Sequence, residues 1–283
     1  AFDVTTGLFY FNQDINYAEQ RLLSGGALTV SGGGRQKQRT GGVFATIDWN
    51  LTDMLTLSVG ARYSAEEKEV QVRSIGVGGC NLDTLRCSYD FRDKENWSGF
   101  TPRVGVQFKP SDDTLLYASF AKGFRSGAIN FRNLNPNVDP GPFDQEKQNA
   151  YEIGLKQEVG GFARINLSGF YSRINGTQRE FQAPFAPFGN FQIITNAADV
   201  SIKGVEGELL LKPVAGLTIA GQFGYTKGKY EKILFDLNAD GVINDRDFAL
   251  KLPRLSPWSY GGSITYATAI GGDFDAEARV GAN

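Results

Sequence analysis

The chain has 283 residues, with 29 lysine and arginine residues against 31 aspartate and glutamate residues, and it contains no histidine. This near balance of charge gives no electrostatic basis for binding nucleic acid, which needs a basic excess or a basic stripe. Without histidine there is no Ser–His or Cys–His pair for nucleophilic catalysis and no histidine-ligated zinc site, so we expect no enzyme and no catalytic cofactor.

Alternation of apolar and polar residues predicts eleven β-strands along the chain. In the stretch "LTLSVGARYS", Leu55, Leu57 and Val59 share one face, while Thr56 and Ser58 lie on the other. This period of two is typical of strands with one apolar and one polar face. The predicted strands are residues 4–20, 40–51, 54–73, 97–109, 114–126, 147–159, 162–179, 196–212, 217–230, 257–268 and 274–283.

Two cysteines, Cys80 and Cys87, lie in the polar, glycine-rich stretch "GVGGCNLDTLRCSYD". A redox CxxC motif has a tighter spacing, and a metal site would need more ligands nearby. We therefore expect a local disulfide across an exposed loop, which implies an oxidising compartment. Two free thiols are the alternative.

Short and long connections alternate between the predicted strands. Outer-membrane β-barrels show this asymmetry, with short periplasmic turns and long extracellular loops. A soluble β-sandwich or propeller is the alternative, because its strands alternate in polarity as well. The short turns are expected at residues 50–54, 109–113, 159–161, 212–216 and 270–273, and the long connections at 22–40, 74–95, 127–147, 181–195 and 231–256.

The expected fold is all-β, an antiparallel transmembrane β-barrel of which residues 1–283 form only a part. A closed bacterial barrel needs an even number of strands, so eleven predicted strands do not close one. No stretch approaches the ~20 apolar residues of a transmembrane helix, and the chain begins in mid-pattern with "AFDVTTGLFYF". We expect a piece of a longer protein in the outer membrane of a Gram-negative bacterium.

The segment "EFQAPFAPFGNFQ" spaces four phenylalanines among prolines, at Phe181, Phe185, Phe188 and Phe191. Exposed aromatic clusters often mark contact with a ligand. These four residues are therefore candidate ligand-binding residues. Packing of loop against loop at the barrel mouth is the alternative.

The stretch "DLNADGVINDRD" resembles a twelve-residue calcium loop. Such a loop takes ligands from positions 1, 3, 5, 7, 9 and 12 and needs glycine at position 6 for a sharp turn. Gly241 stands at position 6, and an aspartate replaces the usual glutamate at position 12. A solvated turn of Asp, Asn and Gly is the alternative. The candidate ligands of a structural calcium ion are Asp236, Asn238, Asp240, the carbonyl of Val242, Asn244 and Asp247.

Four stretches resemble TonB-dependent outer-membrane receptors, in content and in order. They are "LLYASFAKGFRSGAIN" (115–130), "DQEKQNAYEIGLKQE" (144–158), "VSIKGVEGELLLKPVAGLTIAGQFGYTKGKY" (200–230) and "LPRLSPWSYGGSITY" (252–266). The resemblance covers most of the chain from about residue 97 and, more weakly, the earlier part. It implies a barrel of about 22 strands with a plugged lumen. The plug domain, the TonB box and the closing strand of the barrel are expected outside this chain.

The resemblance implies active transport of a scarce nutrient, of the siderophore, cobalamin or glycan class. The implied partners are the TonB–ExbB–ExbD complex, reached through the plug, together with outer-membrane lipid, lipopolysaccharide and a small-molecule or glycan substrate. A passive outer-membrane porin without energy coupling is the alternative function.

Overall fold

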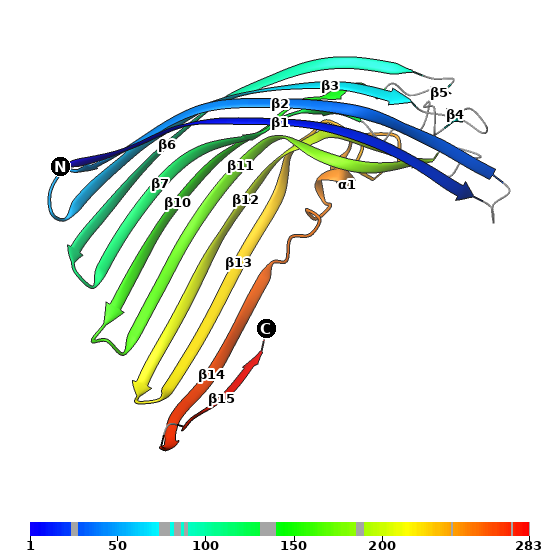
Figure 1. The fold of residues 1–283 in the computed structure, drawn as a ribbon. Helices are drawn as coiled ribbons and strands as arrows, with labels where there is room; N and C mark the ends of the chain where they lie inside the picture. The colour runs from blue at the N-terminus through cyan, green and yellow to red at the C-terminus, as the bar shows by residue number, and fades with distance from the viewer. Residues whose placement is uncertain are drawn as a thin grey trace.

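Eleven strands form one antiparallel sheet in the computed structural model, in the order β1-β2-β3-β6-β7-β10-β11-β12-β13-β14-β15. The structure describes residues 1–23, 28–73, 80–81, 86–87, 90–130, 140–184, 190–238, 240–272 and 274–282. Figure 1 shows a strongly curved sheet in which neighbours along the chain are neighbours in space. The strands are β1 (Phe2–Leu23), β2 (Leu28–Asn50), β3 (Leu55–Arg73), β6 (Phe91–Ser111), β7 (Thr114–Arg125), β10 (Glu146–Val159), β11 (Ala163–Pro184), β12 (Asn190–Val214), β13 (Leu217–Ile233), β14 (Trp258–Gly271) and β15 (Phe274–Ala282).

The sheet is open at both ends. Within the described residues, β1 pairs only with β2, and β15 pairs only with β14. An unpaired strand presents a row of free N–H and C=O groups. The prediction of eleven antiparallel strands that do not close a barrel is therefore confirmed.

The two faces of the sheet differ in polarity, as β3 shows. Val59 and Tyr63 are 45% and 49% exposed on the outer face, whereas Ser58, Ser64 and Lys68 are buried on the opposite, inner face. Successive side chains of a strand point to opposite faces, so these sets follow directly from the alternation in the sequence. The outer face is the apolar one that the alternation predicts.

The prediction of a long loop was wrong at two of the five places, where the structure has mostly strand. The region 22–40 is mostly strand, because β1 runs to Leu23 and β2 starts at Leu28. The region 181–195 is likewise mostly the ends of β11 and β12. The sequence of the first region is rich in glycine and polar residues, and that of the second contains prolines, so both are typical of loops. Cross-strand pairs such as Arg35 with Asp14 stabilise them.

Among the residues that the structure describes, four short strands and one helix lie outside the main sheet. The short strands pair as two small ladders, β4 (Cys80–Asn81) with β5 (Arg86–Cys87) and β8 (Ala128–Ile129) with β9 (Pro142–Phe143). The helix α1 (Asp245–Phe248) lies in the hollow of the curved sheet (Figure 1). No helix in the described ranges is long and apolar enough to cross a bilayer.

Two small apolar clusters anchor the long connections to the inner face. One joins Val70 and Val72 of β3 to Ile129 of β8, with Phe91 packed against it. The other groups residues of β12 and β13 with apolar residues of the connection that follows β13. Its buried members are Ala198, Val200, Tyr230 and Ile233, and Leu237 and Leu252 pack against them.

Candidate functional site at the long-loop end

The connection from β7 to β10 lies across the inner face of the sheet. At its start, the Lys68 amine donates to Ser126 Oγ at 3.0 Å and to the Gly127 carbonyl at 2.7 Å. The same amine lies 5.4 Å from the centre of the Trp97 ring, within the range of a cation–π interaction. The connection is therefore tied to β3, although β6 lies between β3 and β7.

The same connection is tied to β12 at its other side. Asn130 Nδ2 donates to the carbonyl of Ile194 at 3.0 Å, and the Ile194 N–H donates to Asn130 Oδ1 at 2.6 Å. Asn196 makes the equivalent pair with the backbone of Asp144, at 2.9 and 2.6 Å. Each asparagine side chain thus pairs with both the N–H and the C=O group of one backbone residue, as a residue of a neighbouring strand would. The described parts of this connection therefore span the inner face from β3 to β12.

Gly127 allows the close packing at the first of these contacts. A Cβ atom at this position would lie 2.2 Å from the Phe143 carbonyl oxygen and 2.4 Å from Trp97 Nε1. Neither atom belongs to a flexible chain end, so any side chain would displace the connection. The stretch "GFRSGAIN" is part of the family resemblance. The sequence alone does not show that Gly127 must lack a side chain.

Asp247 organises the connection after β13. Its side chain is fully buried, and its oxygens accept the backbone N–H groups of Leu237 at 2.9 Å, Asn238 at 3.1 Å and Asn244 at 3.0 Å. These bonds, the one from Asn244 foremost, favour the carboxylate and lower the pKa of Asp247 below its ordinary value. Asn244 and Asp247 also form the capping box of α1.

The predicted calcium ligands lie in this same loop, held by local hydrogen bonds. Asp236 Oδ2 accepts the N–H of Gly241 at 2.7 Å, and Gly241 has a φ of 91°, which favours glycine. The N–H of Asp240 donates to Asn238 Oδ1 at 2.8 Å, and that of Val242 donates to Asp240 Oδ1 at 3.1 Å. Within the described part of the chain, no three Asp, Glu, Cys or His side chains group closely enough to hold a metal ion. Calcium binding stays a prediction.

The predicted phenylalanine cluster is described only in part. The Phe181 ring lies 4.5 Å from that of Phe235, centre to centre, so the end of β11 contacts the start of the connection after β13. Phe185 and Phe188 lie outside the described residues, as does the side chain of Phe191. The described contact therefore joins a strand end to a loop, and both ligand contact and loop-on-loop packing of the four phenylalanines stay predictions.

The two cysteines face each other in the backbone register. Cys80 of β4 is directly opposite Cys87 of β5. Their side chains lie outside the described residues. The disulfide therefore stays a prediction. The pairing of β4 with β5 places the two backbone positions opposite each other.

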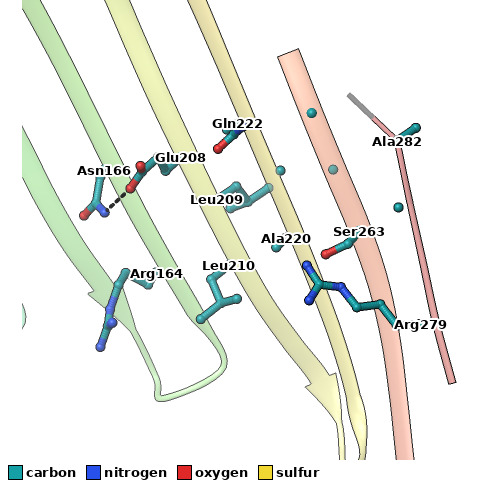
Figure 2. Close-up of a pocket in the computed structure, with 14 residues that line it drawn as sticks. Arg164, Asn166, Glu208, Leu209, Leu210, Ala220, Gln222, Ser263, Arg279 and Ala282 are labelled. Carbon is teal, nitrogen blue, oxygen red and sulfur yellow. Dashed lines mark hydrogen bonds between the residues drawn. The ribbon is translucent and has the colours of Figure 1, made fainter. Parts of the chain in front are cut away.

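A polar groove of about 550 Å³ runs along the inner face from β11 to β15. Figure 2 shows Asn166 donating to Glu208, at 3.0 Å between Nδ2 and Oε2, with Arg279 reaching across from β15. Arg164 also lines the groove and pairs with Glu158 at 2.6 Å. Charges of both signs suit this groove to a polar ligand or to a polar protein surface.

The family comparison covers the whole chain. The family described as TonB dependent receptor-like, beta-barrel, matches residues 1–283. The chain belongs to the TonB-dependent receptor β-barrel family. Barrels of this family are proteins of the Gram-negative outer membrane, so the exposed apolar face of the sheet is the membrane-facing one.

Solved structures of such receptors share the fold. The ferric yersiniabactin uptake receptor FyuA from Yersinia pestis has a TM-score of 0.73 at 18% identity, over 94% of this chain and 37% of that one. The copper transporter OprC has a TM-score of 0.69 at 15% identity, over 98% of this chain and 40% of that one. The ferric-catecholate import receptor Fiu from E. coli K12 has a TM-score of 0.64 at 14% identity, over 94% and 39%. The chain thus spans less than half the length of these receptors and forms a partial barrel of the TonB-dependent fold.

Proposed function

We propose that the chain forms part of the barrel wall of an active outer-membrane importer. The observation that carries this proposal is the match of the receptor-barrel family to residues 1–283. The energy would come from the TonB–ExbB–ExbD complex, acting through a plug domain that we expect elsewhere in the protein. The long connections would face the cell exterior and the short turns the periplasm, as in other outer-membrane barrels.

The substrate we propose is a scarce nutrient, with a metal chelate favoured over a glycan. Solved receptors with this fold include uptake receptors for ferric yersiniabactin and ferric catecholates, a copper transporter, and a hemophore receptor in complex with its hemophore and heme. The contact between Phe181 and Phe235 at the long-loop end supports this proposal, because aromatic side chains there would contact such a ligand as it enters.

Uptake by a deletion strain tests the proposal. The full-length gene is restored on a plasmid, and uptake of iron-labelled siderophores, cobalamin and glycans is measured with and without a functional tonB gene. We expect one substrate class to enter only when both genes are present. Uptake that persists without tonB would instead establish the passive porin.

We propose a structural role for calcium in the loop Asp236–Asp247, as a clamp on the connection after β13. The spacing of oxygen donors and the position of Gly241 support it. Because the ion would lie at the cell exterior, a weak site would be filled by millimolar calcium.

A further inference from the structure

The turn at residues 252–255 holds an arginine in a backbone conformation that favours glycine. Arg254 has a φ of 58°, whereas every other positive φ among the described residues belongs to a glycine. Pro253 precedes it in the turn. A turn with proline at its second position and a positive φ at its third usually has glycine or asparagine at the third. An arginine there costs free energy, because its Cβ atom comes close to a backbone oxygen.

Two leucines fix this turn to β13. Leu252 packs against the buried cluster that includes Val200 and Tyr230 on the inner face. A Cβ atom at Gly228 would lie 2.4 Å from Leu252 Cδ1 and 2.7 Å from Leu255 Cδ2, so the turn lies directly on the strand at a position without a side chain. The residues at both ends of the turn are therefore anchored, and the backbone between them is held in place.

The turn lies on the inner side of the long-loop end. Figure 1 shows the connection running from α1 to β14 inside the hollow of the curved sheet. Just after the turn, the carbonyl of Pro257 accepts the N–H of Thr226 at 2.9 Å, and β14 begins at Trp258. Thr226 follows Tyr225, whose ring centre lies 4.6 Å from that of Trp258, on the side of the long connections. A ligand that enters the barrel from this end therefore passes the turn.

The turn carries an exposed positive charge. Within the parts of the chain that the structure describes, Arg254 makes no hydrogen bond and no ion pair. Lys251, just before the turn, is also exposed and is likewise unpaired in those parts. The stretch "ALKLPRLSP" at residues 249–257 contains these two cations and no acidic residue. The segment therefore carries positive charge that none of its own carboxylates balances.

Solubility alone does not explain an arginine at this position. Glycine or asparagine would suit a solvated turn without the cost in backbone conformation. Backbone strain of this kind persists where the surroundings enforce it, and it concentrates at ligand sites. Here Pro253 and the two anchored leucines enforce the conformation, and the guanidinium of Arg254 is the group that the turn displays.

We propose that Arg254 binds an anionic substrate as the substrate enters the barrel. A guanidinium donates two parallel N–H groups, which match a pair of anionic oxygens such as those of a carboxylate or a catecholate. The ligand class is an anionic metal chelate, and Lys251 adds a second positive charge beside it. Arg254 thus selects by charge and favours anionic chelates over neutral ones. The inference rests on the proposed function for the outward direction of the long connections and for the class of metal chelates.

Isothermal titration calorimetry with the full-length receptor in detergent tests this role. The probes are a ferric tris-catecholate and a ferric citrate complex, which are anionic, and a ferric tris-hydroxamate, which is neutral. We expect the parent protein to bind at least one anionic probe, and Arg254→Gly to bind that probe roughly 10- to 100-fold more weakly. Any affinity for the neutral probe should be the same in both proteins.

Arg246→Gln is the matched control. Arg246 belongs to the same connection and its replacement removes the same charge, but its guanidinium lies 4.0 Å from a carboxylate oxygen of Asp240. This variant should bind the probes as the parent protein does. Glycine suits the positive φ of residue 254, so Arg254→Gly should unfold at the same temperature as the parent protein or at a higher one. Weaker binding with undiminished heat stability separates a ligand contact from a structural role.

Any of four results would overturn the proposal: no binding of either anionic probe to the parent protein, undiminished binding by Arg254→Gly, an equal loss in Arg246→Gln, or a lower unfolding temperature of Arg254→Gly. The inference and the proposed function can fail separately. TonB-dependent uptake of the neutral chelate by a protein that binds no anionic probe would leave the importer standing and refute the role of Arg254. Binding that depends on Arg254 without TonB-dependent uptake would do the reverse.

Discussion

Lys68 and Glu66 form an ion pair on the inner face of β3, with 2.7 Å between Nζ and Oε1 and side chains only 10% and 13% exposed. Both side chains also contact Ser126, the first residue after β7. One charge pair therefore holds β3 and the connection from β7 to β10 together. Removing one partner would leave the other charge buried without compensation.

Lys68→Met should destabilise the folded barrel by about 3 kcal/mol, because breaking a buried pair typically costs about 3–5 kcal/mol. Lys94→Met is the matched control. Lys94 pairs with Glu67 at 2.8 Å but is 52% exposed, so its loss should cost less than about 1 kcal/mol. Urea unfolding in lipid vesicles measures both, and equal effects would contradict the role given to Lys68.

Asn130→Ala should loosen the tie to β12. It removes both hydrogen bonds to the backbone of Ile194, and each unmet buried group costs about 1–3 kcal/mol. We expect faster hydrogen exchange at the Ile194 amide. The exposed Asn12→Ala on β1 should leave that amide unchanged, and protection that survives in Asn130→Ala would show that the connection is held by other contacts.

The loop around Asp247 should lose stability in acid. The folded-state pKa of Asp247 is lowered from its ordinary value of 3.8. The stabilisation is therefore complete above about pH 4 and is lost as the pH falls through the folded-state pKa. Pepsin should cut residues 234–250 more readily as the pH drops below 3.8. Asp247→Asn, which lacks this carboxylate, should show a weaker pH dependence after correction for the pH dependence of pepsin itself. Parallel pH profiles of the two proteins would refute this.

Calcium should protect the same loop from proteolysis at neutral pH. In the parent protein, millimolar calcium should slow cleavage between Asp236 and Asp247, and a chelator should reverse the effect. Asp240→Ala removes a predicted ligand while leaving Asp247 in place, so it should abolish the calcium effect without abolishing the fold of α1. A cleavage rate that does not change with calcium or chelator would contradict calcium binding. It would indicate that the loop is held by its own hydrogen bonds alone.

Cys80 and Cys87 should be oxidised in protein from the outer membrane. Their opposed backbone positions suit a disulfide between neighbouring strands. Alkylation should therefore label neither cysteine until a reductant is added, as peptide mass spectrometry would show. Complete labelling without reductant would mean two free thiols.

The strands were predictable because one side of each faces lipid. The alternation in "LTLSVGARYS" is enough to identify β3 and its outer face. The strand ends beyond the membrane lack that signal. In β2 the residues from Arg35 to Arg39 are polar on both faces, so the periodicity that identifies a strand is missing there.

The candidate site was harder to predict, because its residues are distant in sequence. Asn130 and Ile194 are 64 residues apart, and a single sequence holds no sign of their pairing. Asp247 is different. The pattern that suggests a calcium ligand at position 12 also fits a capping box with Asn244, and the structure assigns the second role without testing the first.

The described parts of the connection from β7 to β10 brace one sector of the barrel wall. Its two anchor points, at β3 and β12, are separated by β6, β7, β10 and β11, an arc of about 24 Å at the usual strand spacing. A segment attached at two points of a curved sheet resists any change in the curvature of the sheet between those points. This sector of the wall can therefore widen or flatten only by breaking the hydrogen bonds of Lys68 or Asn130, and it should keep its shape while less braced sectors adapt.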